Sequence, residues 1–261
     1  MTFIQKWLDA VDRKGSILCV NIDPAEPQQR ANGVLPAGMS KLDWSLKLVE
    51  AVSPYAAAIK PNRQYFKDFS RDEMVQLNQA IHKHGMVSID DSKIADIGDT
   101  NDAALYHAAQ EGFDAVTYAP FPGNIAATCE AAKKHGMGLI PLVLMSNPEY
   151  AVMKNIPIAG QAFYEYLARE SAAHDADGVV VGAPSAKNHL SLEELQRVKE
   201  LIGPRTVLVP GIGAQGGDLE PIVNTFGDYA IVSVGRAIAY NDDPAATARN
   251  YFELIQKLRL S

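Results

Sequence analysis

Basic residues, cysteines and long hydrophobic runs are all scarce in this sequence. Its 24 lysines and arginines are outnumbered by 31 aspartates and glutamates among 261 residues, which gives a net charge of −7, and the basic residues form no run. Such a chain is a poor candidate for nonspecific binding to nucleic acid or to an anionic membrane surface. No apolar run reaches the roughly 18 residues that a membrane span needs. We therefore expect neither nucleic acid nor a membrane as a partner.

Cysteine is limited to Cys19 and Cys129, both in apolar surroundings. They could form one bridge at most, and the sequence has no Cys-x-x-Cys pair or Cys/His cluster with the spacing of a zinc site. We expect two buried thiols in a reducing compartment. The amphipathic segment 1–15 carries Asp9 and Asp12, which is unlike a secretory signal. These features predict a cytoplasmic protein.

The chain does contain a repeated alternation of short, β-rich apolar runs with longer helical patterns. Runs that are almost continuously apolar are typical of parallel strands buried on both faces. Their starts lie 23 to 40 residues apart, the size of a βα unit. The predicted strands are Ile17–Ile22, Ala56–Lys60, Met86–Asp91, Ala115–Tyr118, Gly138–Leu144, Gly178–Val181, Thr206–Pro210 and Tyr229–Val234. Eight such units predict an α/β fold, a single closed (β/α)8 TIM barrel domain over residues 1–261, with an open doubly wound sheet as the alternative.

Two of the predicted connections are unusually long. Pro24–Ser40 follows the first strand and holds three prolines and two glycines, and Asn147–Ala159 follows the fifth. Loops of this length inside a compact domain usually cover a functional site or move. We expect them to border the site.

Charged residues otherwise avoid the predicted strands and collect where the strands end, which in a parallel barrel is the active-site rim. Asp91 and Lys93 are two apart on an extended strand, so their side chains share a face, and Lys60 of the neighbouring strand can approach the same point. Alternating opposite charges keep each other ionised. An ammonium held in this way suits stabilising and then protonating a developing carbanion, whereas a Schiff base needs a neutral amine.

Two more aspartates flank this motif. Asp90 raises the question of which carboxylate faces inward, and strand alternation favours Asp91 because it shares parity with Lys93. Asp96 lies beyond the strand, from where it could reach sideways into the site of a neighbouring subunit. An Asp-x-Lys pair alone is also common as a surface ion pair.

A second candidate site is the segment Gly211-Ile-Gly-Ala-Gln-Gly216 after the seventh strand. It matches a dinucleotide-binding pattern, but fewer than 50 residues remain after it and the next strand ends in Gly235-Arg236 rather than in an acidic residue. Glycine-rich backbone after strand 7 with donors after strand 8 matches the phosphate site that recurs in barrels, with Gln215 and Arg236 as side-chain donors. Two ordinary tight turns are the alternative.

These motifs together resemble the orotidine 5′-phosphate decarboxylase family over nearly the whole chain. The residues that carry the resemblance are Asp91-x-Lys93-x-x-Asp96-Ile97 with Thr100, Met145-Ser146-x-Pro148, Pro210-Gly-Ile-Gly-Ala-Gln-Gly-Gly-Asp218 and Val234-Gly235-Arg236. Ile22-Asp23-Pro24 and Lys60-Pro61-Asn62 are similar to its longer bacterial branch. The Asp-x-Lys-x-x-Asp motif also occurs in sister barrels, the 3-keto-gulonate-phosphate decarboxylases and hexulose-phosphate synthases, from which the Gly-Gln loop and the Met-Ser-x-Pro segment separate this chain.

The resemblance implies a homodimeric barrel that converts orotidine 5′-phosphate to UMP and CO2, the last step of de novo pyrimidine nucleotide synthesis, without metal or organic cofactor. Lys60, Asp91, Lys93 and Asp96 would form a charged network in which Lys93 protonates C6 and Asp91 sits beside the substrate carboxylate. Asp96 and Thr100 would be shared across the dimer interface. The implied substrate contacts are Asp23 and Thr100 at the ribose, Ser146 at the pyrimidine, Gln215, Gly235 and Arg236 at the phosphate, and Ile97 and Pro210 elsewhere in the site.

Two other functions stay open on the residues alone. One is a metal-dependent sugar-phosphate decarboxylase or aldolase-type lyase of the sister barrels. The other is a barrel that binds a phosphorylated ligand without catalysis, in which case the charged motif at the rim would be an unexplained cost.

Overall fold

A closed barrel of parallel strands forms the centre of the computed structural model, which describes residues 1–212 and 218–260. The strands follow one another around the barrel in the order β1-β10-β9-β8-β5-β4-β3-β2, and β2 pairs with β1 to close it. The barrel strands are β1 (Leu18–Ile22), β2 (Ala58–Pro61), β3 (Val87–Ile94), β4 (Ala115–Tyr118), β5 (Gly138–Leu144), β8 (Gly178–Val181), β9 (Thr206–Pro210) and β10 (Ala230–Val234). This confirms the predicted (β/α)8 architecture and excludes the open sheet.

Apolar runs of the kind seen in the sequence produce these strands because each strand is buried on both faces. All four residues of β4 and of β8 are buried, as are all five of β10. The predicted and observed bounds coincide for β4, β5, β8 and β9. The third strand differs, because β3 continues past Asp91 to Ile94. Cys19 and Cys129 are buried and unpaired, as expected.

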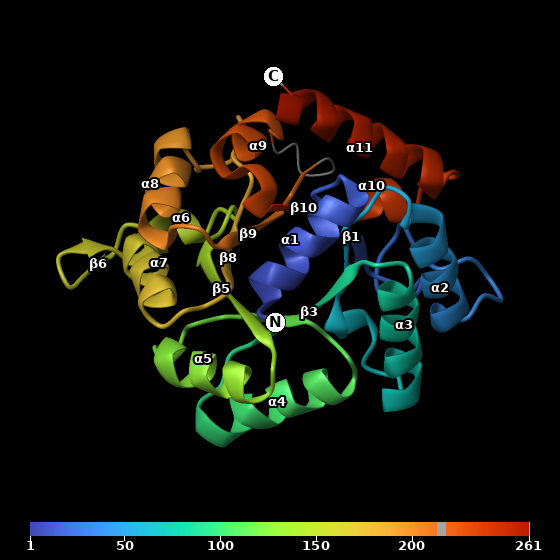
Figure 1. Cartoon of the computed structure of the whole chain (residues 1–261), viewed down its shortest axis with the longest axis horizontal. Helices are drawn as coiled ribbons and strands as arrows, with labels where there is room; N and C mark the ends of the chain where they lie inside the picture. The colour runs from blue at the N-terminus through green and yellow to red at the C-terminus, as the bar shows by residue number, and fades with distance from the viewer. Residues whose placement is uncertain (213–217, 261) are drawn as a thin grey trace.

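Helices surround the barrel, as Figure 1 shows. Several begin with a side-chain cap, and α1, α3 and α8 each have a complete capping box. In this motif the Ser or Thr side chain accepts from the amide three residues later, and the Gln or Glu side chain at that position accepts from the amide of the Ser or Thr. The helices are α1 (Phe3–Lys14), α2 (Lys41–Val52), α3 (Arg71–Lys83), α4 (Gly98–Gln110), α5 (Ile125–Lys134), α6 (Tyr150–Met153), α7 (Phe163–Ala173), α8 (Leu192–Ile202), α9 (Glu220–Phe226), α10 (Arg236–Ala239) and α11 (Pro244–Leu260), with 3-10 turns η1 (Arg63–Tyr65) and η2 (Gly227–Tyr229).

Helix α1 covers the end of the barrel at which the strands begin (Figure 1). The Phe3 amide donates to Asp177 Oδ1 at 3.1 Å, immediately before β8, and Lys6 Nζ contacts Asp114 Oδ1 at 2.8 Å, immediately before β4. Trp7 is fully buried, and its Nε1 donates to the carbonyl oxygen of Asp228 at 2.8 Å. With this end closed, the carboxyl ends of the strands form the open rim.

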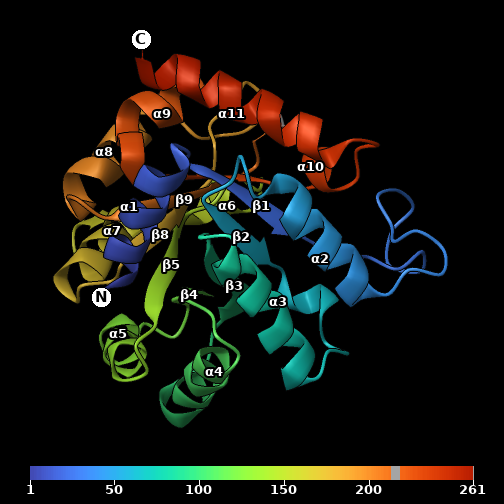
Figure 2. The ribbon, with the colours of Figure 1, turned by 45° about the vertical axis from the view of Figure 1, so that its right-hand side comes forward.

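The two long connections take different forms. The segment 24–40 between β1 and α2 contains no helix or strand, and Figure 2 shows it standing out beside α2. The connection after β5 contains α6 and a small antiparallel hairpin of β6 (Pro157–Ile158) and β7 (Gln161–Ala162). Both leave the barrel from the carboxyl ends of strands, which places them beside the predicted site.

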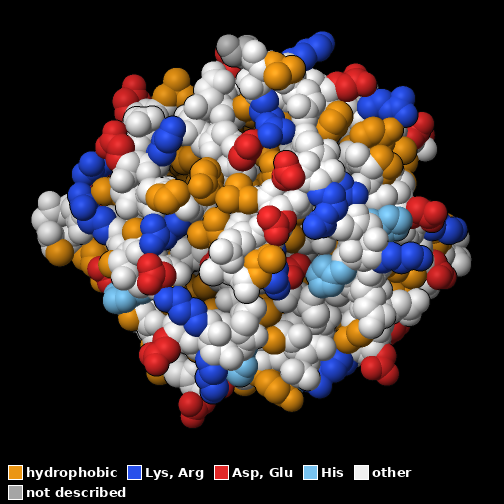
Figure 3. Space-filling view, in the orientation of Figure 1, with side chains coloured by type: hydrophobic (Ala, Val, Ile, Leu, Met, Phe, Trp, Pro, Cys, Tyr) orange, Lys and Arg blue, Asp and Glu red, His pale blue; other side chains and the backbone are white. Residues whose placement is uncertain are grey.

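The outer surface mixes charges of both signs. On the face that α1 covers, acidic and basic side chains are interspersed rather than gathered by sign (Figure 3). Among the described residues, no helix has both the length and the apolar character required to cross a membrane.

Candidate active site

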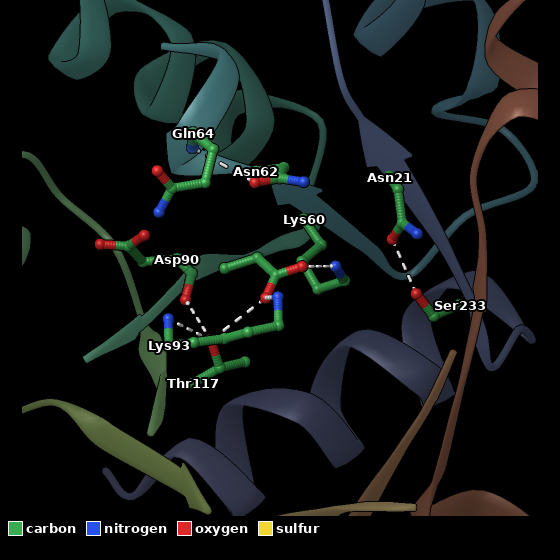
Figure 4. A network of polar contacts seen from close by, with 9 residues as sticks. Asn21, Lys60, Asn62, Gln64, Asp90, Lys93, Thr117 and Ser233 are labelled. Carbon is green, nitrogen blue, oxygen red and sulfur yellow. Dashed lines mark hydrogen bonds and ion pairs between the residues drawn. The ribbon is translucent and has the colours of Figure 1, made fainter. Parts of the chain in front are cut away.

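A cluster of three charged side chains lies at the rim, where β2 and β3 end. Lys60 and Asp91 are only 4% and 6% exposed, and Lys60 Nζ donates to Asp91 Oδ2. Lys93 Nζ donates to the other oxygen, Oδ1, while 45% of the Lys93 side chain remains exposed. Figure 4 shows the Lys60 and Lys93 side chains converging on the same point. One carboxylate therefore pairs with a buried ammonium and with a second ammonium that is open to the rim.

The charges in this cluster stabilise one another. Burial alone would raise the pKa of Asp91, but the ammonium groups of Lys60 and Lys93 outweigh it and hold the pKa of Asp91 well below its usual range. Burial would likewise lower the pKa of Lys60, and the Asp91 carboxylate raises it instead. The buried pair is therefore ionised at neutral pH. Lys60 is held as an ammonium, which does not suit Schiff-base chemistry.

Lys93 occupies an unusual backbone conformation. Its φ is +51°, in the left-handed region, and the pairing of β3 with β4 shifts register between Asp90 and Ile94. A non-glycine residue in this region costs on the order of 1–2 kcal/mol, and such costs are concentrated at functional sites. β3 is thus not a regular strand at Lys93. The Lys93 side chain nevertheless contacts Asp91.

Thr117 of β4 fastens this irregular segment, and the sequence reasoning missed it. Its hydroxyl accepts from the Lys93 amide at 3.0 Å and contacts Asp91 Oδ1 at 3.2 Å (Figure 4). Thr117 is 1% exposed. The available signal was a hydroxyl within the apolar run Ala115–Tyr118, because a buried polar group needs a partner.

Asp90 is turned away from the cluster. Figure 4 shows its carboxylate pointing away from Lys60 and Lys93. Burial raises the pKa of Asp90 to about 7, with Arg63 opposing the shift and Glu111 adding to it. Asp90 Oδ1 has no hydrogen-bond partner among the described residues. Asp91 is therefore the carboxylate that contacts Lys93, as expected, although the left-handed backbone at Lys93 departs from the regular strand on which that expectation was based.

The segment that follows β3 carries three of the predicted site residues, and all of them are exposed. Asp96, Ile97 and Thr100 are exposed, Ile97 to 60%. Asn101 Nδ2 donates to the Asp96 carbonyl oxygen at 2.5 Å, and the Ile97 amide donates to Asp96 Oδ1 at 2.8 Å. Within the described residues of this single chain, Asp96 forms no ion pair with Lys60 or Lys93. The chain by itself thus assembles three of the four predicted members of the network.

A cavity of about 340 Å³ lies at the same rim, in the size range of small-molecule sites. It adjoins the charged cluster because Asn21 of β1 pairs in register with Lys60, and Ser233 Oγ donates to Asn21 Oδ1 at 2.7 Å (Figure 4). Asn21, Asp23, Arg30, Tyr65, Pro210, Gly211, Ile212, Ser233, Gly235 and Arg236 line it.

Four predicted substrate-binding residues therefore share one cavity, namely Asp23, Pro210, Gly235 and Arg236. Gln215 lies outside the described residues. Arg30 and Tyr65 also line the cavity. Sequence reasoning missed both, because they lie outside the barrel strands and no pattern in the sequence places them near Ser233 of β10. Gly211, with φ +99°, is in a conformation that favours glycine.

Ser146 lies just past the end of β5. It packs against Gly182, where a Cβ would lie 2.8 Å from Ser146 Cβ. The segment beyond it is fixed by Lys154, whose Nζ donates to the His189 carbonyl oxygen at 2.6 Å and pairs with Glu194 at 2.5 Å. Ser146 thus belongs to the rim, on the barrel wall formed by β5 and β8. Among the described residues, no group of three His, Cys, Asp or Glu side chains is arranged to hold a metal ion.

Comparison with known proteins gives one family across nearly the whole chain. The model of the orotidine 5′-phosphate decarboxylase / HUMPS family matches residues 16–251. The orotidine 5′-phosphate decarboxylase of Cupriavidus necator is 32% identical over 96% of this chain and 94% of its own, and that of Variovorax paradoxus is 33% identical over 98% and 95%. The solved structure of Leishmania donovani OMP decarboxylase superposes with a TM-score of 0.83 over 100% of both chains at 24% identity, which shows a shared barrel fold.

Proposed function

The chain belongs to the orotidine 5′-phosphate decarboxylase / HUMPS family, and from that premise we propose that it decarboxylates orotidine 5′-phosphate to UMP and CO2 in pyrimidine biosynthesis. The observation that carries the proposal is the Lys60–Asp91–Lys93 cluster beside a cavity lined by Arg236. A substrate with a carboxylate at one end and a phosphate at the other matches this distribution of charge.

Lys93 has the position and the charge for the chemical step. When the bond from C6 to the carboxylate breaks, CO2 leaves and the electron pair stays on C6. The Lys93 ammonium stabilises that charge and transfers a proton from Nζ to C6, forming the C–H bond of UMP. Because its side chain is 45% exposed, the resulting neutral amine can recover a proton from solvent after product leaves.

Asp91 and Lys60 prepare Lys93 for this step. Asp91 would lie beside the substrate carboxylate, and its Oδ1 accepts from Lys93 Nζ. Lys60 acts as a positioning residue, because it is buried and its contact is with Asp91 Oδ2. Thr117 holds both the Lys93 amide and the Asp91 carboxylate, which fixes the direction of the proton donor.

The remaining predicted contacts would bind the parts of the substrate that do not react. Arg236 and Gly235 would hold the phosphate together with Gln215, Asp23 and Thr100 the ribose, and Ser146 the pyrimidine, with Ile97 and Pro210 also contacting substrate. Binding energy from the phosphate helps assemble the reactive geometry at C6. The phosphate contacts therefore lower the barrier to decarboxylation, although this step takes place far from the phosphate.

The whole chain, 1–261, would act as one barrel domain in a cytoplasmic homodimer. Support for the dimer comes from the exposed segment after β3, which presents Asp96, Ile97 and Thr100 at the surface. In the dimer, Asp96 would complete the network of the neighbouring subunit, and Thr100 would contact that subunit's ribose. The reaction itself would need neither metal nor organic cofactor.

Product analysis distinguishes this function from the metal-dependent lyase, the Schiff-base aldolase and the non-catalytic binding barrel. Purified protein incubated with orotidine 5′-phosphate and EDTA is expected to release UMP and CO2 in equal amounts. Turnover that requires added Mg²⁺ would favour the metal-dependent lyases of the family. Borohydride trapping of a substrate adduct on Lys60 or Lys93 would indicate a Schiff-base aldolase. Tight UMP binding without turnover would indicate a binding barrel.

A further inference from the structure

Arg30, in the segment between β1 and α2, is held in one place at the rim cavity. Its Nε donates to the Gly33 carbonyl oxygen at 2.6 Å and its Nη2 to the Asp23 carbonyl oxygen at 3.0 Å. The guanidinium carbon lies 5.3 Å and 4.9 Å from the ring centroids of Tyr65 and Tyr240. A long, flexible side chain is thus held by contacts within the protein, which lowers the entropic cost of using it in recognition.

The loop itself is folded around this arginine. Tyr240 Oη donates to the Asp23 carbonyl oxygen at 2.7 Å and accepts from the Ala25 amide at 3.1 Å, while its ring stacks on Trp44 with centroids 5.0 Å apart. Gly33 has φ +66°, and a Cβ there would lie 3.3 Å from the Tyr240 ring. These contacts join the loop after β1 to the helix that begins at Arg236.

Arg30 has no carboxylate partner among the residues that the structure describes. Within the part of the chain that the structure describes, neither Arg30 nor Arg236 forms an ion pair with a carboxylate. Both line the same cavity of about 340 Å³, which Asp23 also lines, but the bond from Arg30 goes to the backbone oxygen of Asp23. Two guanidinium groups without carboxylate partners at one cavity offer charged hydrogen-bond donors to an anion that has several oxygens.

We propose that Arg30 is a second guanidinium of the phosphate-binding end, a specificity-determining residue that recognises the phosphate dianion together with Arg236. This inference rests on the proposed function, which supplies a nucleoside monophosphate as the ligand. It also gives the long loop after β1 a role, because the loop brings a second guanidinium group to the cavity that Arg236 lines. Lysine would replace Arg30 poorly, since it lacks the planar fork that is stacked between two tyrosines.

Calorimetric titration with UMP and with uridine, which lacks the phosphate, tests this assignment. For Arg30→Ala we expect the Kd of UMP to rise about 10-fold or more, as for loss of a charged hydrogen bond, and that of uridine to change less than about twofold. Arg30→Lys should recover part of the UMP affinity. Arg169→Ala, at an exposed position of α7, is the matched control and should bind both ligands as the wild type does.

Two results would overturn the inference. Equal weakening of UMP and uridine would mean that Arg30 only positions the loop, and unchanged UMP affinity would mean that it does not reach the phosphate. Arg30→Gln, which keeps the length of the side chain, replaces the alanine variant if thermal melting shows that the latter is unfolded. The two proposals can fail separately. If UMP binding depends on Arg30 but the wild-type protein does not turn over orotidine 5′-phosphate, the proposed function is refuted and this inference stands. If turnover is normal but UMP binding does not depend on Arg30, this inference is refuted and the proposed function stands.

Discussion

Lys60 and Lys93 contact opposite oxygens of a single carboxylate, with Lys60 on Oδ2 and Lys93 on Oδ1 of Asp91. The two lysines are not equivalent, because one is buried and the other is open to the rim. Asp91 therefore compensates a buried charge and, in the proposed mechanism, also holds the proton donor. Substitutions at these three positions should separate stability from catalysis.

In the proposed mechanism the catalytic task falls on Lys93. Replacing it with alanine would remove the proposed proton donor and the charge beside C6, so we expect Lys93→Ala to lower kcat by about 10³-fold or more. The Kd of UMP should change little, because Arg236 and the cavity remain. Steady-state kinetics with calorimetry measure both quantities, and Lys83→Ala on the exposed end of α3 is the control. Near-normal kcat in Lys93→Ala would show that the proton comes from elsewhere.

The structural task falls on the buried pair. Asp91→Asn leaves the Lys60 ammonium buried without its partner, which should lower the free energy of unfolding by about 3–5 kcal/mol. Adding Lys60→Met to Asp91→Asn should restore part of that loss, so the two substitutions will be non-additive. Urea denaturation of the two single variants and the double variant provides the coupling. Simple additivity would refute the pairing.

Asp90 predicts a pH dependence of stability. Its pKa is about 7 in the folded protein against an ordinary 3.8, so the folded state binds more protons than the unfolded state between these values. The contribution of Asp90 to the free energy of unfolding therefore decreases as pH rises from about 4 to about 7. Asp90→Asn removes this penalty and should gain on the order of 2 kcal/mol more over wild type at pH 8 than at pH 5.

Unfolding at both pH values tests this directly, with Asp12→Asn on the exposed side of α1 as the control. A gain from Asp90→Asn that is the same at pH 5 and pH 8 would contradict the raised pKa.

If Arg236 binds the phosphate, its substitution should affect turnover of a phosphorylated substrate but not of one that lacks the phosphate. For Arg236→Ala we expect the KM for orotidine 5′-phosphate to rise by about 10-fold or more, and kcat to fall by less. Turnover of orotidine, which lacks the phosphate, should be unaffected because the lost contact is absent there. Parallel kinetics on both compounds measure this. An equal loss on both would place Arg236 away from the phosphate.

The proposed sharing of Asp96 across a homodimer interface predicts complementation between subunits. Asp96→Asn and Lys93→Ala should each be nearly inactive, because each removes one member of every site. In mixed dimers one of the two sites receives both intact residues, so equal mixing with subunit exchange should restore about a quarter of wild-type activity. Activity measured against mixing ratio reports this. Failure to recover any activity after verified exchange would place Asp96 in its own subunit's site.

The fold was predictable because parallel barrel strands leave continuous apolar runs of regular spacing, and β4, β5, β8 and β9 coincide with those runs. Strand alternation led to the choice of Asp91 over Asp90, although the strand is not regular at Lys93. The left-handed backbone at Lys93 could not be foreseen, since no local signal marks a lysine for that region. Arg30 escaped notice because its place depends on Tyr65 and Tyr240, which are far from it in sequence.

The most direct test of the account is the rate at which purified protein consumes orotidine 5′-phosphate in EDTA, followed by the loss of its ultraviolet absorbance. We predict sustained turnover that is unchanged by added Mg²⁺ and is abolished by Lys93→Ala. Absence of turnover by folded wild-type protein under these conditions would contradict the assignment of the Lys60–Asp91–Lys93 cluster as a cofactor-free decarboxylase site.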